Sequence, residues 1–324
     1  MQAVVLQGIG DVEQLVLMEQ PDPTPGPGEV LLRVRAAGLN FADVRTRQGR
    51  YLRSPKLPAI IGFEAAGEVL AVGPGVTDLQ PGQRVMGSTR TGAYAEVAVA
   101  PAATLRPIPG HMSFEAAAAV PVVFLTVYHS LVTQGRLAAG ERVLIHAAGG
   151  GVGTVAVQWA KLLGATVYAT ASSQAKLDRV RSLGADVCIN YASTNFAATV
   201  REQTGGEGVD VVLESVGGQV FTDSLSLLRP LGRLVVIGRA TGVDPSSVDP
   251  TLLLARSLTV SGFYLGGVRQ NSPLGERAWQ AVLDVLAGRR VRPVIGHTLP
   301  LAQIREAHRL LESRESFGKI IVVP

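Results

Sequence analysis

The fold of this chain is decided by the stretch His146-Ala147-Ala148-Gly149-Gly150-Gly151-Val152-Gly153-Thr154. Residues 141–145, which end in Val-Leu-Ile, predict a buried strand, and residues 155–163 predict a helix. The glycines between them therefore form a strand-to-helix turn. Such a turn presents backbone N–H groups and the positive end of a helix to a phosphate. Glycine is needed because a Cβ would block the close approach of a pyrophosphate. A strict G-x-G-x-x-G is absent, so the flanking strand and helix carry the interpretation.

The composition bounds the class of protein. The 324 residues, 47% of them hydrophobic, are enough for two domains with substantial cores. The net charge is only +4, and no run of Lys or Arg is long enough to indicate a nucleic-acid-binding arm. The single cysteine, Cys188, excludes a disulfide framework and a cysteine-based zinc site.

The N-terminal residues begin directly as a strand, without a basic region or a cleavage site. The most apolar stretch, at 116–127, is too short to span a bilayer and contains Pro121. We therefore expect a cytoplasmic protein.

The pattern of short apolar runs divides the chain into three parts. Residues 1–122 contain short strand-like runs separated by Gly- and Pro-rich turns, which is typical of an all-β, barrel-like domain. Residues 123–265 alternate between strands and helices, which predicts a doubly wound parallel sheet of the dinucleotide-binding type. Residues 266–324 contain two helices and a closing strand, and we expect this tail to return to the first domain.

Within the alternating part, the expected strands cover 142–146, 166–170, 186–190, 209–214, 232–237 and 258–263. The expected helices cover 151–163, 174–183, 194–204, 218–228 and 250–255. The last strand would form an edge of the sheet rich in Leu, Val and Phe. Because exposed edges of this kind tend to pair with another chain, we expect a homodimer.

Several further motifs occur in a fixed order, at Ala36–Asp43, Pro58–Gly67, Gly73–Val76, Pro81–Val85, Glu214–Gly218 and Phe317–Lys319. On these motifs and the glycine turn, the chain resembles the zinc-independent, zeta-crystallin-like quinone oxidoreductases of the medium-chain dehydrogenase/reductase superfamily. The resemblance implies a GroES-like β-barrel domain, a Rossmann domain and a cofactor in the cleft between them. Zinc-dependent relatives carry a cysteine where this chain has Asn40 and a histidine where it has Phe63, so the resemblance also implies a metal-free enzyme.

The nature of the dinucleotide follows from the end of the second strand. An NAD site places Asp or Glu about 20 residues beyond the glycine turn to bind the ribose hydroxyls. Here no acid follows the strand until Asp178, whereas Ser172, Ser173 and Lys176 could bind a 2′-phosphate. We therefore predict NADPH. The resemblance adds Tyr191 to the residues around this phosphate. An exposed helix lysine and an ordinarily packed tyrosine are the alternatives for Lys176 and Tyr191.

The resemblance implies further cofactor contacts by Asn40, Thr126, Gly150, Gly151, Val152, Gly153, Ser215, Ile237, Phe263, Leu265 and Lys319. Of these, Asn40 and Thr126 would lie near the nicotinamide, and the glycine turn would take the pyrophosphate. Thr126 and Leu265 could instead belong to the core.

The residues expected around the acceptor are Asn40, Arg45, Arg47, Tyr51 and Tyr94. We take Asn40, Arg47 and Tyr51 as candidate catalytic residues. Tyr51 is the best candidate proton donor, because related enoyl reductases carry a tyrosine in a similar Gly-x-Tyr context, although a tyrosine packed on the cleft wall is an equal alternative. The five histidines lie far apart in the sequence, and we interpret none of them as a general base.

These observations favour an NADPH-dependent quinone reductase that transfers hydride without a metal, since a quinone takes its proton readily from solvent. The alternative is an NADPH-dependent reductase of activated C=C bonds in enones, enals or enoyl thioesters. An NADPH-binding protein with a structural or RNA-binding role ranks third, because the basic residues are scattered.

Overall fold

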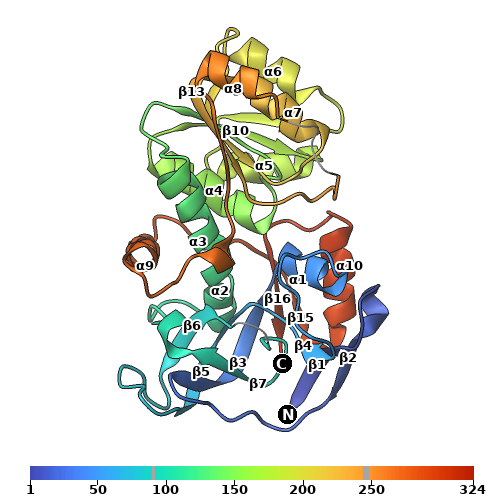
Figure 1. Ribbon diagram of the computed structural model, residues 1–324, viewed down its shortest axis with the longest axis vertical. Coiled ribbons are helices and arrows are strands. Elements are labelled where there is room, and N and C mark those ends of the chain that lie inside the picture. The colour runs from blue at the N-terminus through green and yellow to red at the C-terminus, as the bar shows by residue number, and fades with distance from the viewer. Residues whose placement is uncertain (90–91, 244–247) are drawn as a thin grey trace. The chain divides into compact units, whose positions relative to one another are not determined.

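The computed structural model describes residues 1–89, 92–243 and 248–324, which form two compact units (Figure 1). Unit 1 comprises Met1–Val123, Arg269–Glu276 and Pro293–Pro324. Unit 2 comprises Phe124–Val268 and Arg277–Arg292.

The strands of unit 1 are β1 (Gln2–Leu6), β2 (Leu15–Glu19), β3 (Glu29–Leu39), β4 (Ala59–Ile60), β5 (Glu64–Val72), β6 (Arg84–Ser88), β7 (Val97–Pro101), β8 (Leu105–Pro107), β15 (Ile295–Pro300) and β16 (Lys319–Val323). One sheet has the order β2-β1-β4. The larger sheet has the order β15-β16-β3-β5-β6-β8, with β7 also pairing with β3. This pairing does not close on itself among the described residues, so the expected barrel is an open sheet.

Strand β3 organises unit 1. Its first residues alternate between buried and exposed, as expected for a strand with one face in solvent, and its last four are all buried. The change occurs where α2 (Phe114–Ala118) covers the strand. At Gly38 a Cβ would lie 2.5 Å from Glu64 Oε1 and 2.6 Å from the Ala118 carbonyl oxygen, so only glycine fits there. The other helices of unit 1 are α1 (Phe41–Arg47) and α10 (Ile304–Glu312), while α3 (Pro121–Tyr128) crosses into unit 2.

The strands of unit 2 are β9 (Arg142–Ile145), β10 (Thr166–Ala171), β11 (Val187–Asn190), β12 (Val209–Glu214), β13 (Leu228–Val236) and β14 (Thr259–Gly262). They are parallel and have the order β11-β10-β9-β12-β13-β14, which is the doubly wound order of a Rossmann fold. All six predicted strands are thereby confirmed. Only β13 departs by several residues, because it begins at Leu228 rather than at 232.

The helices of unit 2 are α4 (Gly151–Leu162), α5 (Gln174–Ser182), α6 (Phe196–Gln203), α7 (Gln219–Ser226), α8 (Pro250–Arg256) and most of α9 (Pro273–Ala287). Side chains of α6, α7 and α8 share one hydrophobic cluster with the sheet. Helices α4 and α5, which pack on β9, β10 and β11, contribute nothing to that cluster. The two sets of helices therefore cover opposite faces of the sheet, as expected for right-handed crossovers.

The tail of the chain differs from the prediction. Residues 277–292 belong to unit 2 instead of returning to the first domain. The Gln158 side chain on α4 explains this, because it accepts a hydrogen bond from the Arg292 backbone N–H (3.1 Å) and donates one to the Arg292 carbonyl (3.0 Å). Backbone groups outside regular structure are satisfied by such contacts, which hold this segment against α4.

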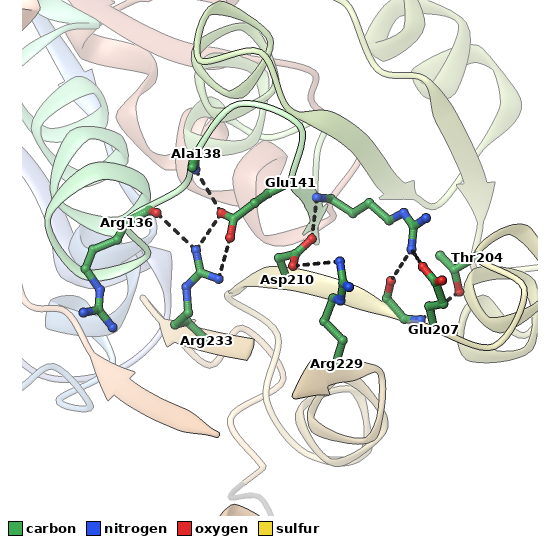
Figure 2. A network of polar contacts seen from close by, with 10 residues as sticks. Arg136, Ala138, Glu141, Thr204, Glu207, Asp210, Arg229 and Arg233 are labelled. Carbon is green, nitrogen blue, oxygen red and sulfur yellow. Dashed lines mark hydrogen bonds and ion pairs between the residues drawn. The ribbon is translucent and has the colours of Figure 1, made fainter. Parts of the chain in front are cut away.

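The amino ends of the strands of unit 2 are joined by a polar network (Figure 2). Arg233 on β13 donates to both carboxylate oxygens of Glu141 at 2.9 and 2.6 Å. Asp210 on β12 accepts from the Arg142 backbone N–H at 2.8 Å and pairs with Arg229 at 3.3 Å. Since ligands of open parallel sheets bind at the opposite, carboxyl edge, this network stabilises the sheet without occupying that edge.

Candidate active site

The glycine turn follows β9 at the carboxyl edge of the sheet. The Ala148 N–H donates to the Thr170 carbonyl (2.9 Å) and the Gly150 N–H donates to the Ala147 carbonyl (2.9 Å), which ties the turn to β10 and closes it. Helix α4 begins directly after Gly150, which has no side chain to cap it. The first N–H groups of α4 therefore lack partners within the helix, and an anion could accept hydrogen bonds from them.

Gly153 allows the close contact between α4 and the turn. A Cβ at this position would lie 2.5 Å from both the Ala147 carbonyl oxygen and the Ala148 Cα. Neither backbone atom can move away without displacing the turn. Ala147 itself has a φ of 50°, a left-handed conformation that is unusual for alanine. The turn is therefore a strained and tightly packed element of the kind found at binding sites.

The residues predicted to bind the 2′-phosphate lie along the same edge. Ser173 caps helix α5, and its hydroxyl accepts a hydrogen bond from the Lys176 N–H (3.4 Å). The Tyr191 N–H donates to the Ala171 carbonyl (3.1 Å), which brings the end of β11 to the end of β10. The tyrosine side chain is 44% exposed. These residues surround the positive end of α5, where a phosphate is favoured.

No carboxylate occupies the ribose position at the end of β10. The first acid of α5, Asp178, lies in the second turn of the helix and accepts a hydrogen bond from Gln174 (2.8 Å). The residues present therefore fit a 2′-phosphate and lack the acid that would bind a free ribose hydroxyl.

The ends of the fourth and fifth strands are also joined. The Ile237 N–H donates to the Glu214 carbonyl (2.8 Å), and the Ala240 N–H donates to the Ser215 carbonyl (2.9 Å). The buried Glu214 carboxylate accepts from the N–H groups of Val216 and Gly217 at 2.7 and 2.9 Å. Burial raises the pKa of Glu214, and these N–H groups oppose the rise. Glu214 thus shapes the loop that presents Ser215.

The Phe263 ring stacks on the His129 ring at a centroid distance of 5.2 Å. His129 follows Thr126 in the chain, where α3 passes into the π-helical turn His129–Gln134. Leu265 begins a short 3₁₀ turn just beyond and is half-buried. Phe263 therefore lies beside the helical stretch that carries Thr126, and the contact of either residue with the cofactor stays a prediction.

In unit 1, Asn40 is held by a buried polar cluster. Lys319 Nζ donates to Asn40 Oδ1 at 2.5 Å and pairs with Glu64 Oε1 at 2.6 Å. Asn40 Nδ2 donates to the same Glu64 oxygen at 2.8 Å, and the Asn40 backbone N–H donates to Asp43 Oδ2 at 2.7 Å. Glu64 Oε2 accepts from the Val122 N–H at 2.8 Å. The amide of Asn40 is therefore fixed in one orientation.

Asp43 is fully buried beside this cluster. Burial raises the pKa of the Asp43 carboxyl to about 7. The Asn40 N–H, the charge of Lys319 and the Tyr94 hydroxyl oppose this rise. Tyr94 faces this carboxyl, but neither Asp43 Oδ1 nor the Tyr94 hydroxyl has a well-formed hydrogen bond. Burial also raises the pKa of Tyr94. We expected the Tyr94 side chain to face the acceptor. This prediction is wrong, because the ring is buried in the core of unit 1.

Arg47 also differs from the prediction. Its guanidinium is 2% exposed and pairs with Glu312 at 2.7 Å, so it connects α1 to α10 inside unit 1 instead of facing a ligand. Arg45 lies with its guanidinium 5.0 Å from the Phe41 ring centre. The Tyr51 ring packs against Phe63 at a centroid distance of 5.4 Å, and Tyr51 is half-buried. Tyr51 thus neighbours Phe63, where zinc-dependent relatives carry a histidine.

From the sequence we interpret Glu64 as a structural residue that orients its loop, and we assign no role to Asp43 or Glu214. The available signal was three carboxylates inside otherwise apolar motifs, since buried acids require partners. In the parts of the chain that the structure describes, no group of His, Cys, Asp and Glu side chains could hold a metal ion. No helix among the described residues is long and apolar enough to cross a membrane.

Comparisons with known proteins agree with this geometry. Residues 26–110 match the alcohol dehydrogenase GroES-like domain, and residues 151–287 match the zinc-binding dehydrogenase family. The chain is 35% identical to the rat synaptic vesicle membrane protein VAT-1 homolog, over 100% of this chain and 84% of that protein. It is 36% identical to a 2-haloacrylate reductase of Burkholderia sp., over 99% and 98% of the two chains.

Among solved structures, the quinone oxidoreductase of Escherichia coli complexed with NADPH is 33% identical and superposes with a TM-score of 0.94, over 100% of both chains. The two-unit architecture, the glycine turn and these similarities agree along the whole chain. The chain therefore belongs to the zinc-independent, quinone-oxidoreductase-like group of the medium-chain dehydrogenase/reductase superfamily.

Proposed function

We propose that this protein is an NADPH-dependent reductase that transfers hydride to an electron-poor small molecule. The observation that carries the proposal is the carboxyl edge of unit 2, where a glycine turn precedes the uncapped N-terminus of α4 and where Ser172, Ser173 and Lys176 stand in place of a ribose-binding acid. The NADPH complex of the Escherichia coli relative supports the same cofactor.

NADPH, when bound, supplies a hydride to the acceptor, and the protein supplies orientation and electrostatics. The N–H groups of Gly151, Val152 and Gly153 would bind the pyrophosphate, and Lys176 with Tyr191 would hold the 2′-phosphate. Ser215, Ile237, Phe263 and Leu265 would border the remainder of the cofactor. Asn40, fixed by Glu64 and Lys319, would present one unchanging polar surface to the reacting groups.

The first candidate acceptor is a quinone, supported by the similarity to the Escherichia coli quinone oxidoreductase. The second is an activated C=C bond, supported by the similarity to a 2-haloacrylate reductase over 98% of that enzyme's length. For the alkene, the hydride goes to the carbon distant from the activating group and a proton goes to its neighbour. Tyr51 is the residue proposed to provide that proton.

The acceptor class is tested by comparing kcat/KM for a neutral quinone and a neutral enone, with NADPH saturating and with NADH as the comparison. The proposal expects NADPH to be the better donor for whichever acceptor is reduced. Equal use of NADH and NADPH would contradict the assignment of the phosphate site, and a higher kcat/KM for the enone would favour the second candidate.

We also propose a homodimer formed through β14, the outer strand of the six-stranded sheet. Among the described residues this strand pairs on one side only, with β13, so its other side offers backbone N–H and carbonyl groups that another copy could bind. Nearby, Leu254 on α8 is 83% exposed. Light scattering should give twice the chain mass, and a monomer at micromolar concentration would contradict the proposal.

A further inference from the structure

Residues 44–63 of unit 1 carry five cationic side chains and no carboxylate. Arg47 is neutralised internally by Glu312. Arg50, Arg53 and Lys56 are exposed, and none of the three forms an ion pair with any residue that the structure describes. This basic segment therefore has an excess of positive charge, because no ion pair with a described residue offsets Arg50, Arg53 or Lys56.

An exposed carboxylate lies near the basic segment. The Gly10 N–H donates to the Arg47 carbonyl (3.0 Å), so the exposed Asp11 lies close to the end of α1. Three exposed cations, Arg50, Arg53 and Lys56, lie on the basic segment itself. A local excess of one sign raises the concentration of oppositely charged ligands at the surface.

Apolar side chains are interspersed with these cations. Leu52 is 77% exposed and Ile9 is 64% exposed. Ile9 lies against the same turn, because a Cβ at Gly49 would lie 2.8 Å from the Ile9 side chain. Exposed leucine and isoleucine beside arginine form an amphipathic surface, which suits a ligand that has both an anionic group and a hydrocarbon part.

Contacts connect the basic segment to Asn40. Tyr51 lies between Arg50 and Leu52, and its ring packs on Phe63 at 5.4 Å. Phe63 precedes Glu64, whose carboxylate accepts the hydrogen bond from Asn40 Nδ2 at 2.8 Å. Arg50 is therefore adjacent in sequence to Tyr51, which is linked through Phe63 and Glu64 to Asn40. The proposed reduction uses both Tyr51 and Asn40.

We propose that the acceptor is anionic, and that Arg50 and Arg53 bind its carboxylate or phosphate group while its hydrocarbon part covers Leu52 and Ile9. This inference rests on the proposed reductase function and names the substrate class. Arginine suits the role because its planar guanidinium forms paired hydrogen bonds with either anion. The anion could be a carboxylate of the acceptor itself or a phosphate of a coenzyme A-type carrier.

Matched acceptors with and without the anion separate these possibilities. The phosphate arm compares crotonyl-coenzyme A with neutral crotonyl-N-acetylcysteamine. The carboxylate arm compares crotonate with methyl crotonate. A quinone arm compares naphthoquinone with its sulfonate. Each acceptor is measured with wild type, Arg50→Gln, Arg53→Gln and the double variant. Arg33→Gln is the control, because Arg33 on β3 is also exposed and without an ion pair among the described residues.

For the anionic member of at least one arm, each substitution should raise KM about threefold to fivefold with kcat preserved, as expected for the loss of one exposed charge contact. The neutral partner and the Arg33→Gln variant should change by less than about twofold. The arm that responds identifies the anion. Equal effects on charged and neutral acceptors, or none on either, would overturn the proposal while turnover by the wild type leaves the reductase function standing.

Binding provides a second readout that does not depend on turnover. Calorimetric titration of coenzyme A and of crotonate into wild type and the double variant, with NADP⁺ saturating, should show weaker binding to the variant for the responding ligand. If no acceptor is reduced but this difference remains, the reductase function fails and the anion site stands. If wild type and variant bind both anions equally, the anion site is refuted.

Discussion

Lys319 and Glu64 form a buried ion pair in unit 1, with Nζ 2.6 Å from Oε1 and with side-chain exposures of 5% and 0%. The pair connects the last strand, β16, to the first residue of β5, and both partners also bond to the Asn40 amide. The tail of the chain thus fixes the residue that we propose to lie beside the reacting groups.

Breaking this pair should destabilise the protein strongly. Glu64→Gln leaves the Lys319 ammonium buried without its counter-charge, so the free energy of unfolding should fall by about 3–5 kcal/mol. Urea denaturation measures the change. The control is Glu68→Gln, because Glu68 pairs with Arg35 on the surface at 29% and 47% exposure and should cost no more than about 1 kcal/mol. Similar losses in the two variants would contradict the structural role of the buried pair.

Gly153→Ala should weaken NADPH binding more than it affects the folding of unit 1. The added Cβ would lie 2.5 Å from two backbone atoms of the turn, so α4 or the turn must shift away from the geometry that binds the pyrophosphate. Fluorescence titration should show that the dissociation constant for NADPH rises at least tenfold. This rise corresponds to a loss of about 1.4 kcal/mol of binding free energy. Gly110→Ala, where a Cβ meets nothing within 4 Å, should bind as wild type does. Unchanged binding by Gly153→Ala would be inconsistent with the pyrophosphate site.

Lys176→Ala should discriminate between the two cofactors. A charge-assisted hydrogen bond to the 2′-phosphate contributes about 1.5–3 kcal/mol, so the KM for NADPH should rise about tenfold to a hundredfold. The KM for NADH, which lacks that phosphate, should be nearly unchanged. Arg181→Ala, in the last turn of the same helix, is the matched control. Equal effects of Lys176→Ala on both cofactors would refute the assignment.

Much of unit 2 could be predicted from the sequence because short apolar strands and glycine turns are local signals. The six strands and the turn at Gly150–Gly153 follow from such patterns. The cluster around Asn40 could not be predicted, since Glu64 and Lys319 meet only when β16 and β5 both join β3. The burial of Arg47 depends in the same way on Glu312, which is 265 residues away in sequence.

Tyr51→Phe should separate the two acceptor classes. If Tyr51 donates the proton, kcat for enones should fall by a factor of about 10²–10⁴, because general acid catalysis contributes that much. Reduction of quinones, which are protonated by solvent, should be spared. Because phenylalanine keeps the packing on Phe63, the comparison removes only the hydroxyl. Enone reduction at the wild-type rate would show that the hydroxyl donates no proton.

Stability should fall as the pH drops from about 6.5 toward 3. Burial lowers the pKa of both His146 and His308 to about 3, below their ordinary value of 6.5, so the unfolded state binds protons that the folded state refuses. Each histidine contributes at most about 1.4 kcal/mol per pH unit. Asp43, with a pKa raised to about 7, acts oppositely, because its proton stabilises the folded state fully below pH 3.8 and this contribution is lost as the pH rises from 3.8 to about 7.

Two histidine variants check this dependence. Neither ring nitrogen of His308 has a hydrogen-bond partner among the described residues, so His308→Leu should keep the stability at pH 7 and flatten the acid slope. His146 contacts the hydroxyls of Thr170 and Ser224 at 3.0 and 2.8 Å, so His146→Leu should cost about 1–3 kcal/mol at pH 7. Urea midpoints between pH 4 and 7 measure both effects. An unchanged acid slope in both variants would refute the assignment to these histidines.

The central claim, that the chain is an NADPH-dependent reductase, is tested most directly by the steady-state oxidation of NADPH, followed by its absorbance, across a panel of quinones and enones. NADPH should be oxidised in the presence of an acceptor, with a higher kcat/KM than NADH. Tight binding of NADPH without oxidation by any acceptor in the panel would contradict it and would favour a non-enzymatic, NADPH-binding protein.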